Sequence, residues 1–303
     1  MMSDKQEANP RHWLQDRLFR ALIWSLKRLP YRIRVPLCGR IVSGVIAPLA
    51  GYRRRIRSNL ALVMPDLPKA EVEKIVRDVP DNVGRTLIEI YSGEEFIARA
   101  AGLPLTGAGV AALEEARRTN RPVILVTAHF GNYDATRAAL IARGFTVGAL
   151  YMNMSNRYFN EHYLRAISTI GTPLFPRGRE GLGQMVKFLR QGGMLGMLID
   201  QHMTRAPLLG FFGHEAQTAL SAAELALKYD ALCVPVYAVR QQDGLSFQVI
   251  VEDPIPHSDP VTMTQALNDS LEALVRRYPG QWFWIHKRWK HGGARLPSPD
   301  AET

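Results

Sequence analysis

The 303-residue sequence lacks the features of a disulfide-bonded secreted protein. It contains two cysteines, Cys38 and Cys233, each in an apolar stretch and far apart in the chain. Two isolated cysteines exclude a disulfide framework and a four-cysteine zinc site, and they fit a reducing compartment. The first residues do not show the basic and then apolar pattern of a cleaved signal peptide. No run of 18 apolar residues occurs, so we expect no unbroken transmembrane helix.

Several signatures of catalysis and of cofactor binding are also missing. There is no G-x-S-x-G motif, which would place a nucleophilic serine at a strand-to-helix turn. The eight histidines do not show the spacing of metal ligands. We therefore expect neither a metal nor a cofactor, and any chemistry must rest on the side chains themselves.

Acidic residues are scarce near the N-terminus, and this shortage locates the charge of the chain. Lys and Arg total 38 against 28 for Asp and Glu, which gives a formal net charge of +10. Between Arg11 and Arg57 stand twelve Lys or Arg residues and a single acid, Asp16, so this segment accounts for the whole net charge. Such a segment binds either nucleic acid or an anionic membrane surface.

The apolar residues of this basic segment favour the membrane surface. Their helical spacing, with basic residues between them, is typical of a helix that lies in the membrane interface. They are Trp13, Leu14, Leu18, Phe19, Leu22, Ile23, Trp24 and Leu26. No base-reading motif accompanies the charge, so we do not expect nucleic-acid binding. A solvated helix face with ordinary core contacts remains the alternative.

The chain changes its pattern near residue 120, and this change predicts the fold class. Residues 11–100 read as helices with breaks at Pro30, Pro48 and Pro65, and they form the predicted membrane-associating region. Short β-branched apolar runs then alternate with helical patterns, which predicts an α/β fold with a mixed, mostly parallel sheet flanked by helices. We expect an α/β core over 101–291 and disordered tails at 1–10 and 292–303.

The predicted strands and helices of this core set the position of any site, because chemistry in such sheets gathers at the carboxyl ends of strands. The expected strands are 123–128, 145–152, 173–175, 194–199, 232–240 and 246–252, and the expected helices are 133–143, 157–170, 182–190, 219–229 and 263–277.

A histidine follows the first buried strand of this core. His129 stands at the strand end, Gly131 allows a tight turn, and Asp134 falls in the first turn of the next helix. Across such a turn the carboxylate of Asp134 would orient the imidazole and leave one ring nitrogen as a base. Backbone amides of Gly131 and Asn132 would point toward a developing oxyanion. A histidine bonded to a carbonyl, with Asp134 as a helix cap, is the structural alternative.

No serine or cysteine nucleophile accompanies His129 in the sequence. The base must therefore activate a group that the substrate brings, such as a hydroxyl or a water molecule.

The segment His129-Phe-Gly-Asn-Tyr-Asp134 resembles the H-x-x-x-x-D/E motif of the bacterial lipid A biosynthesis acyltransferases, the lauroyl and myristoyl transferases of the glycerolipid acyltransferase superfamily. The resemblance covers roughly residues 12–291. Besides the histidine motif it includes the segments 53–65, 157–181, 198–201, 233–238 and 279–289.

This resemblance implies a membrane-associated O-acyltransferase at the cytoplasmic face of the bacterial inner membrane, peripheral or shallowly inserted. The acyl donor would be acyl carrier protein, or alternatively acyl-CoA, and the acceptor a hydroxyl of an anionic lipid A precursor. His129 would be the general base and Asp134 its orienting partner. The substrate-binding residues implied are Arg165, Arg177, Arg179, Asp200 and Arg288.

The sequence departs from the wider superfamily in one informative position. Glycerol-phosphate acyltransferases commonly carry an acid after the proline of F-P-E-G-T, whereas this chain has Arg177 there. The cation favours a more highly phosphorylated acceptor over a simple lysophospholipid. Lysophosphatidate, an ornithine lipid and a glycosylated phosphatidylinositol remain alternative acceptors, and a non-catalytic lipid-binding module remains the alternative outside the enzymes.

Overall fold

The computed structural model describes residues 9–290, 293–294 and 296 of the chain. The tails predicted at 1–10 and 292–303 lie largely outside these residues, although Pro10 already begins the first helix.

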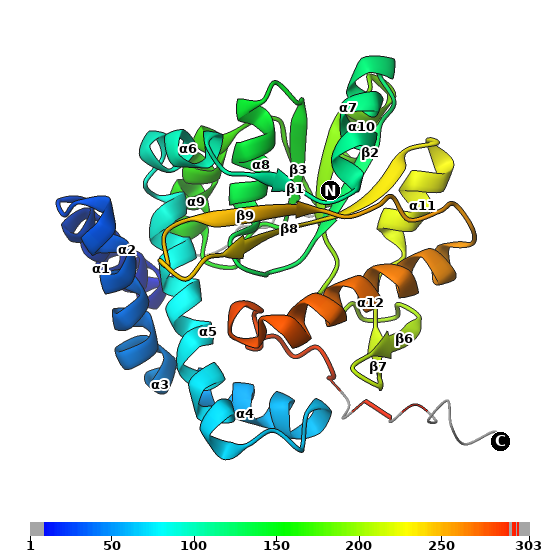
Figure 1. Ribbon diagram of the computed structural model, residues 1–303. Helices are drawn as coiled ribbons and strands as arrows, with labels where there is room; N and C mark the ends of the chain where they lie inside the picture. Colours follow the sequence, from blue (N-terminus) through cyan, green and yellow to red (C-terminus); the bar gives the residue numbers. More distant parts are fainter. Residues whose placement is uncertain (1–8, 291–292, 295, 297–303) are drawn as a thin grey trace.

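A seven-stranded sheet forms the centre of the molecule (Figure 1). Its strands, in spatial order, are β1 (Leu105–Thr106), β9 (Phe247–Val251), β8 (Leu232–Arg240), β2 (Val123–Thr127), β5 (Met194–Leu198), β3 (Val147–Tyr151) and β4 (Leu174–Pro176). Among the described strands of this sheet, β8 and β9 pair antiparallel and the other neighbours pair parallel. The predicted mixed, mostly parallel α/β sheet is therefore confirmed.

Helices cover both faces of this sheet, which is why every residue of the central strand β2 is buried. One face packs against α6 (Glu94–Ala101), α7 (Gly109–Thr119), α8 (Tyr133–Ala142) and α9 (Arg157–Ile170). The other face packs against α10 (Arg179–Arg190), α11 (Ser221–Lys228) and α12 (Pro260–Arg277). Side chains alternate between the two faces along each strand.

The N-terminal third is helical, as predicted. It consists of α1 (Pro10–Lys27), α2 (Tyr31–Ile41), the π-helical turn η1 (Val42–Ile46), α3 (Ala47–Leu49), α4 (Tyr52–Val63) and α5 (Lys69–Ile90). Pro30 precedes α2 and Pro65 follows α4, as expected. The break expected at Pro48 comes two residues later, at Ala50 and Gly51. The chain stays helical from α2 through η1 and α3, which contains Pro48, and Gly51 with φ 71° precedes α4.

The long helix α5 lies between the other N-terminal helices and the sheet (Figure 1). Ile88 packs against the cluster formed by α1 and α2, whereas Val76 and Val79 pack against α4, α12 and the C-terminal segment. The N-terminal helices are thus joined through α5 to the core that carries the strands.

Within the described residues, no single helix is long and apolar enough to cross a bilayer. The segments Tyr31–Leu49 and Tyr52–Val63 pass that test only when they are taken together, and they are bent by 85°.

The sequence did not predict the small hairpin of β6 (Leu208–Phe211) and β7 (His214–Gln217). Phe212 and Gly213 form its two-residue turn, and both have positive φ angles, 57° and 69°. This is the geometry of a type I′ turn, for which Asn-Gly or Asp-Gly is the usual sequence signal. A phenylalanine at the first turn position hides the hairpin from pattern reading.

Candidate active site

Two neighbouring parallel strands bring a histidine and an aspartate to the same edge of the sheet. Thr127 at the end of β2 pairs with Leu198 at the end of β5. His129 and Asp200 therefore each stand two residues beyond a matched pair of strand ends. The carboxyl edge of a parallel sheet is where binding and catalytic groups converge.

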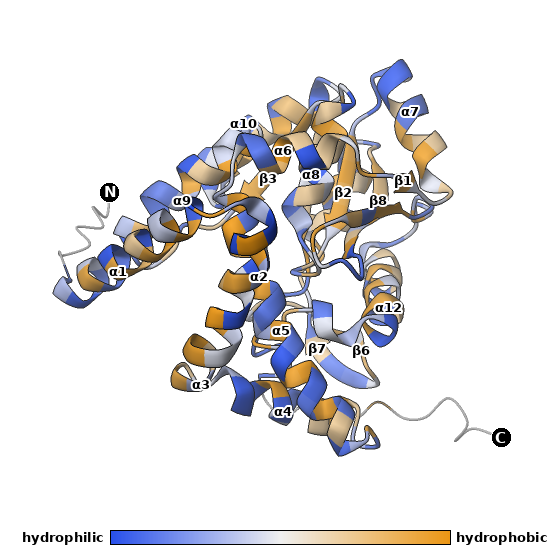
Figure 2. Cartoon of the chain, turned by 60° about the vertical axis from the view of Figure 1, so that its left-hand side comes forward, coloured by the Kyte–Doolittle hydropathy of each residue, from blue (hydrophilic) through white to orange (hydrophobic). Residues whose placement is uncertain are grey.

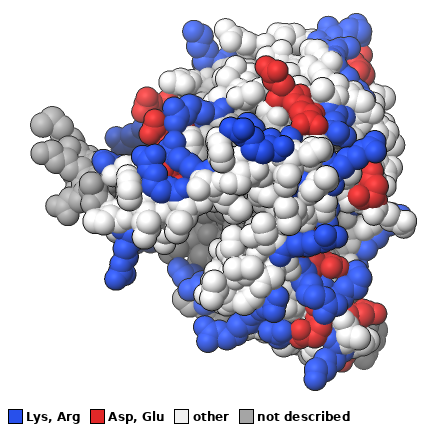
Figure 3. Space-filling model, turned by 90° about the vertical axis from the view of Figure 1, so that its left-hand side faces the viewer, with Lys and Arg blue, Asp and Glu red and all other residues white. Residues whose placement is uncertain are grey.

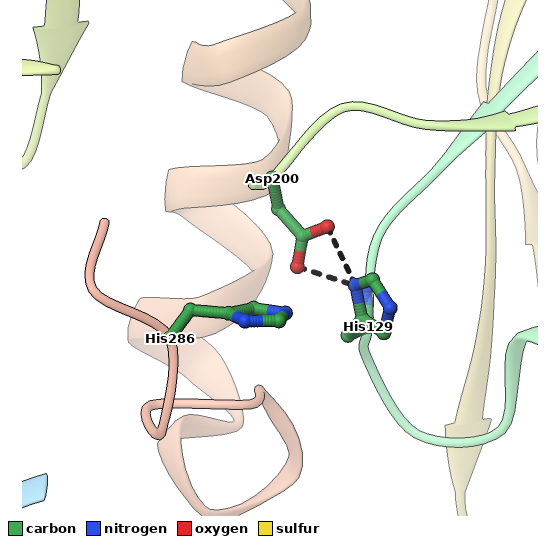
Figure 4. A group of neighbouring side chains, drawn as sticks. All are labelled: His129, Asp200 and His286. Atoms are coloured by element: carbon green, nitrogen blue, oxygen red, sulfur yellow. Dashed lines mark hydrogen bonds and ion pairs between the residues drawn. The ribbon is translucent and has the colours of Figure 1, made fainter. Parts of the chain in front are cut away.

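Asp200 holds His129 by two hydrogen bonds (Figure 4). The ring Nδ1 lies 2.9 Å from Asp200 Oδ1, and the backbone N–H of His129 donates to Oδ2 at 2.9 Å. Trp282 Nε1 donates to the same Oδ2 at 3.0 Å. An ionised carboxylate only accepts hydrogen bonds, so Nδ1 carries the proton and Nε2 is left as the basic nitrogen.

The environment of Asp200 favours its charged form despite its complete burial. Burial by itself opposes the charge, but electrostatic attraction from the His129 imidazole and its hydrogen bonds outweigh this cost. They hold the pKa of the Asp200 carboxyl well below its usual value. Asp200 can therefore stabilise an imidazolium when His129 takes up a proton.

A second imidazole completes the group. His286 lies with its ring centroid 4.7 Å from that of His129, at an angle of 77° (Figure 4). Burial lowers the pKa of His286 to about 4, with further lowering from His129 and Arg288, so this ring is neutral at neutral pH. In the sequence, His286 is marked only by its place in a basic C-terminal segment.

One potential ligand atom from each of His129, Asp200 and His286 lies within 4.8 Å of the others. No metal-ligand spacing was seen in the sequence, because these residues come from three distant segments. Both Asp200 oxygens accept N–H bonds, and the protonated Nδ1 of His129 has no free lone pair. The two Asp200 oxygens and the Nδ1 of His129 are therefore committed to hydrogen bonds with one another and with Trp282.

The predicted hydrogen bond between His129 and Asp134 is not found. Asp134 is 5% exposed and pairs with Arg137, whose Nη2 lies 2.8 Å from Oδ1. Arg137 also donates to the carbonyl oxygens of Ile167 and Gly171 in and after α9. The first turn of α8 directs Asp134 toward Arg137 one turn further along, whereas Asp200 on the adjacent strand end reaches the ring directly.

The turn after His129 is held by backbone and side-chain hydrogen bonds. Gly131 has φ +52°, and a Cβ there would lie 1.9 Å from the carbonyl oxygen of Ala238, so only glycine fits. Its N–H donates to the Gln281 carbonyl oxygen at 3.0 Å, and its own carbonyl accepts from Asn82 and Thr86 of α5.

These contacts overturn the expectation that Gly131 donates to an oxyanion, because its N–H already has a partner. Asn132 is fully buried and lines neither cavity of the site. Its side-chain oxygen accepts from the N–H of Asp134, and its amide nitrogen donates to Glu89 at 2.8 Å. Asn132 therefore anchors the start of α8.

A buried ion pair lies next to the turn that follows His129. Glu89 of α5 is fully buried and pairs with Arg240 at the end of β8, with Nη2 and Oε2 2.8 Å apart. Arg240 Nε also donates to Asn82 Oδ1 at 2.7 Å. This set was not predicted from the sequence, although Asn82, Thr86 and Glu89 recur at helical spacing and form a polar stripe within an otherwise apolar helix face.

A cavity of about 330 Å³ opens beside His129. It runs between the sheet and helices α8 and α9, and its mouth includes Arg177 and the loop after β5. Most of its wall is apolar, and Leu125, Val147, Ala149, Leu174, Gly196 and Ile167 line its inner part. This shape fits a long apolar ligand whose reactive end lies at His129.

A second cavity of about 120 Å³ reaches His129 from the side of α5. Val79, Val83, Leu87 and Phe283 contribute to its wall. His129, Tyr133 and Tyr163 line both cavities, so the imidazole stands where the two meet.

The predicted substrate-binding arginines lie at different places relative to the two cavities. Arg177 is exposed and lines the mouth of the large cavity. Arg165 and Arg179 are exposed but line neither cavity, and Arg165 pairs with Glu161 at 3.5 Å. Arg288 is 1% exposed and donates to the Gln217 carbonyl oxygen at 2.6 Å, so the expectation that it contacts substrate is not met. Asp200, expected to bind substrate, instead orients His129.

Comparison with known proteins identifies the family. A family model described as bacterial lipid A biosynthesis acyltransferase matches residues 1–291. The chain is 26% identical to lipid A biosynthesis acyltransferase 1 of Shigella flexneri, over 95% of this chain and 90% of that protein. It is 25% identical to the lipid A biosynthesis myristoyltransferase of Escherichia coli K12, with the same coverage.

A relative named for a different acceptor has a similar identity over a shorter part of the chain. The phosphatidylinositol mannoside acyltransferase of Mycolicibacterium smegmatis is 25% identical, over 79% of this chain and 80% of that protein.

Proposed function

We propose a specific reaction for this chain, which belongs to the bacterial lipid A biosynthesis acyltransferase family and is an acyltransferase. It moves a fatty acyl group from an acyl carrier protein thioester to a hydroxyl of a lipid A precursor. His129 is the general base, and Asp200 is its orienting carboxylate. The observation that carries this proposal is the Asp200–His129 pair at the junction of a long apolar cavity and a second cavity.

The reaction follows from the tautomer that Asp200 imposes. His129 Nε2 accepts the proton of the acceptor hydroxyl while its oxygen attacks the thioester carbonyl carbon. The tetrahedral intermediate then expels the donor thiolate, and the imidazolium returns the proton to sulfur. The products are an ester and a free thiol, and the enzyme is regenerated. Asp200 stabilises the transient positive charge on His129 because it stays ionised.

The two cavities supply places for the two substrates. The acyl chain of the donor lies in the large apolar cavity with its thioester at His129, and the acceptor hydroxyl approaches the same imidazole from the other side. Arg177 at the mouth is placed to contact a phosphate or the pantetheine end of the donor. Acyl-CoA presents the same thioester and is the alternative donor.

A second acceptor is supported by the mannoside acyltransferase relative, which has the same 25% identity as the myristoyltransferase over a shorter part of the chain. On that interpretation the acceptor is a glycosylated phosphatidylinositol, and the catalytic residues are unchanged. Lysophosphatidate and ornithine lipid fit the cation at Arg177 less well.

We place the enzyme at the cytoplasmic face of the inner membrane through its N-terminal helices. On α1, Trp13, Leu14, Leu18 and Trp24 are between 46% and 65% exposed. Arg17 lies over the ring of Trp13 and Arg28 over the ring of Trp24, at 5.4 and 4.3 Å from the ring centroids. Exposed tryptophans beside arginines suit the interface of an anionic bilayer.

The test is transfer of radiolabelled acyl chains by the purified protein, with acyl carrier protein and coenzyme A thioesters as donors. Underacylated lipid A precursor, mannosylated phosphatidylinositol and lysophosphatidate are the acceptors. We expect turnover of the lipid A precursor. Turnover of mannosylated phosphatidylinositol alone would establish the second acceptor, and no turnover of any acceptor would contradict the proposal.

Variants of the two residues test the proposed roles of His129 and Asp200. We expect His129→Ala and Asp200→Asn each to lower kcat by roughly 10²–10⁴-fold with little effect on the melting temperature. His257→Ala, at an exposed histidine bonded to the Ala231 carbonyl oxygen, is the control and should retain activity. If folded Asp134→Asn lost more kcat than folded Asp200→Asn, the assignment of Asp200 would be wrong.

A further inference from the structure

The floor of the large cavity contains a notch where three strands run side by side. Leu125 of β2 pairs with Gly196 of β5, and Gly196 pairs with Ala149 of β3. All three residues line the cavity. Because side chains in register on parallel strands point to the same face, the two smallest residues of this row leave space beside Leu125.

This row lies well inside the cavity. Leu125 is four residues before His129, which corresponds to a depth of ~13 Å along the strand. The next row inward consists of Val123, Met194 and Val147, of which only Val147 lines the cavity. Val123 and Met194 are buried in the core and close this end.

Gly196 is a position where a side chain would enter open space. A Cβ there would lie 3.5 Å from the carbonyl oxygen of Gly148 and 4.0 Å from the Ala149 Cβ, which are ordinary contacts. The neighbouring Gly148 differs, since a Cβ there would lie 2.8 Å from the ring of Phe175 on the opposite face. The glycine at 196 is therefore not required by packing, and its effect is to keep the notch open.

We infer that Gly196, together with Ala149, sets the length of acyl chain that the enzyme accepts, by letting the chain pass the middle row and reach Val147. This inference rests on the proposed function, in which the cavity holds the donor acyl chain. Any carbon added at Gly196 displaces a methylene from the inner end of the cavity. Donors whose acyl chain ends between His129 and the row of Gly196 are not affected.

The size of the effect follows from the burial of methylene groups. Each methylene that no longer fits costs about a fourfold loss of binding. We expect Gly196→Ala to lower kcat/KM for the longest accepted donor by roughly 4-fold and Gly196→Val, with three added carbons, by roughly 60-fold. For the shortest accepted donor, kcat/KM should stay within about twofold of the wild type in both variants.

The experiment compares saturated donors of graded chain length in wild type, Gly196→Ala, Gly196→Val and Ala149→Val. Binding of free saturated fatty acids of the same lengths is measured in parallel by calorimetry, so the readout does not depend on turnover. Gly183→Val in α10, where a Cβ meets nothing within 4 Å, is the matched control and should leave the length profile unchanged.

The outcomes separate the inference from the proposed function. If the wild type transfers no acyl chain but its fatty-acid binding shifts to shorter chains in the variants, the proposed function fails and the assignment of Gly196 stands. An unchanged length profile in folded Gly196→Val and Ala149→Val overturns the inference. An equal loss for all lengths, short ones included, overturns it as well, since a barrier deep in the cavity spares short chains.

Discussion

At the scale of single residues, the site depends on the hydrogen bonds that the buried carboxylate of Asp200 accepts. Asp200 has no exposed surface, yet both of its oxygens accept hydrogen bonds, from the ring and backbone of His129 and from Trp282. A buried charge with a complete set of partners can stay ionised, whereas one without partners would be neutralised. The orientation of His129 is thus fixed before any substrate binds.

His286 makes the stability of this site depend on pH. The pKa of His286 is about 4 in the folded protein and about 6.5 in the unfolded chain, where burial and the neighbouring positive groups are absent. Above pH 6.5 the ring is neutral in both states and contributes nothing. As the pH falls toward 4, only the unfolded chain takes up the proton, so unfolding becomes easier. We expect a loss of about 2 kcal/mol between pH 7 and pH 5 from this residue.

Urea unfolding of wild type and His286→Gln at pH 7 and pH 5 measures this contribution. His162, whose pKa is lowered by burial, contributes with the same sign in both proteins and cancels in the comparison. We expect the free energy of unfolding to fall less on acidification in His286→Gln. An identical fall in both proteins would show that His286 is not held neutral.

At the scale of elements, α5 joins the N-terminal helices to the turn that carries His129. Its polar stripe of Asn82, Thr86 and Glu89 contacts the turn carrying His129 and the buried end of β8. Such a stripe is costly inside a protein unless every group has a partner, and here the partners are Gly131, Asn132 and Arg240. Helix α5 therefore positions the loop that carries His129 as well as packing against it.

The hydroxyl of Thr86, which lies 2.8 Å from the Gly131 carbonyl oxygen, tests this role. We expect Thr86→Val to lower kcat several-fold, because the turn shifts, and to lower stability by about 1 kcal/mol. KM for the donor should change little, since the cavity is intact. Thr86→Ser should restore kcat, which a purely volume-filling role would not predict.

Thr119→Val is the control for that comparison, because the Thr119 hydroxyl bonds a carbonyl of its own helix on the surface of α7. Equal kcat for wild type and Thr86→Val would contradict a positioning role for α5.

At the scale of the whole molecule, one edge carries both apolar and basic groups. Figure 2 shows apolar patches along α1, α2 and α3 at this edge, and Figure 3 shows Lys and Arg spread over the face these helices present. Ile33, Val45 and Leu49 add to the exposed apolar residues of α1. The residues of the predicted amphipathic stripe have different environments in the structure. Ile23 and Leu26 are buried, and Phe19 and Leu22 pack beside them. The exposed residues are Trp13, Leu14, Leu18 and Trp24.

Binding to vesicles tests whether this edge meets the membrane. We expect co-sedimentation with anionic vesicles that weakens as salt is raised, because exposed charge pairs are screened. Leu18→Glu with Trp24→Glu should weaken binding roughly tenfold or more, since both side chains lose apolar burial and gain repulsion.

Leu208→Glu with Val261→Glu introduces the same charges at exposed apolar residues of β6 and α12, and it should bind like the wild type. Equal weakening by both double variants would show only a charge effect, and the proposed membrane edge would be wrong.

The sequence alone determined the alternation of strands and helices and the place of His129. Periodicity and β-branched apolar runs are local signals, so β2, α9 and β8 were predicted within a residue or two. The family was recognised from local motifs for the same reason. The buried polar stripe of α5 was visible in the sequence, but its partners were not.

Only the tertiary structure decided which carboxylate serves His129. The motif places Asp134 five residues away, yet the start of α8 turns that side chain to Arg137, and the neighbouring strand end supplies Asp200 from 71 residues away. The closeness of His286 and the notch at Gly196 likewise come from strand order and register. Chain spacing carries no information about which strand ends lie side by side, because that choice is made by packing of the whole sheet.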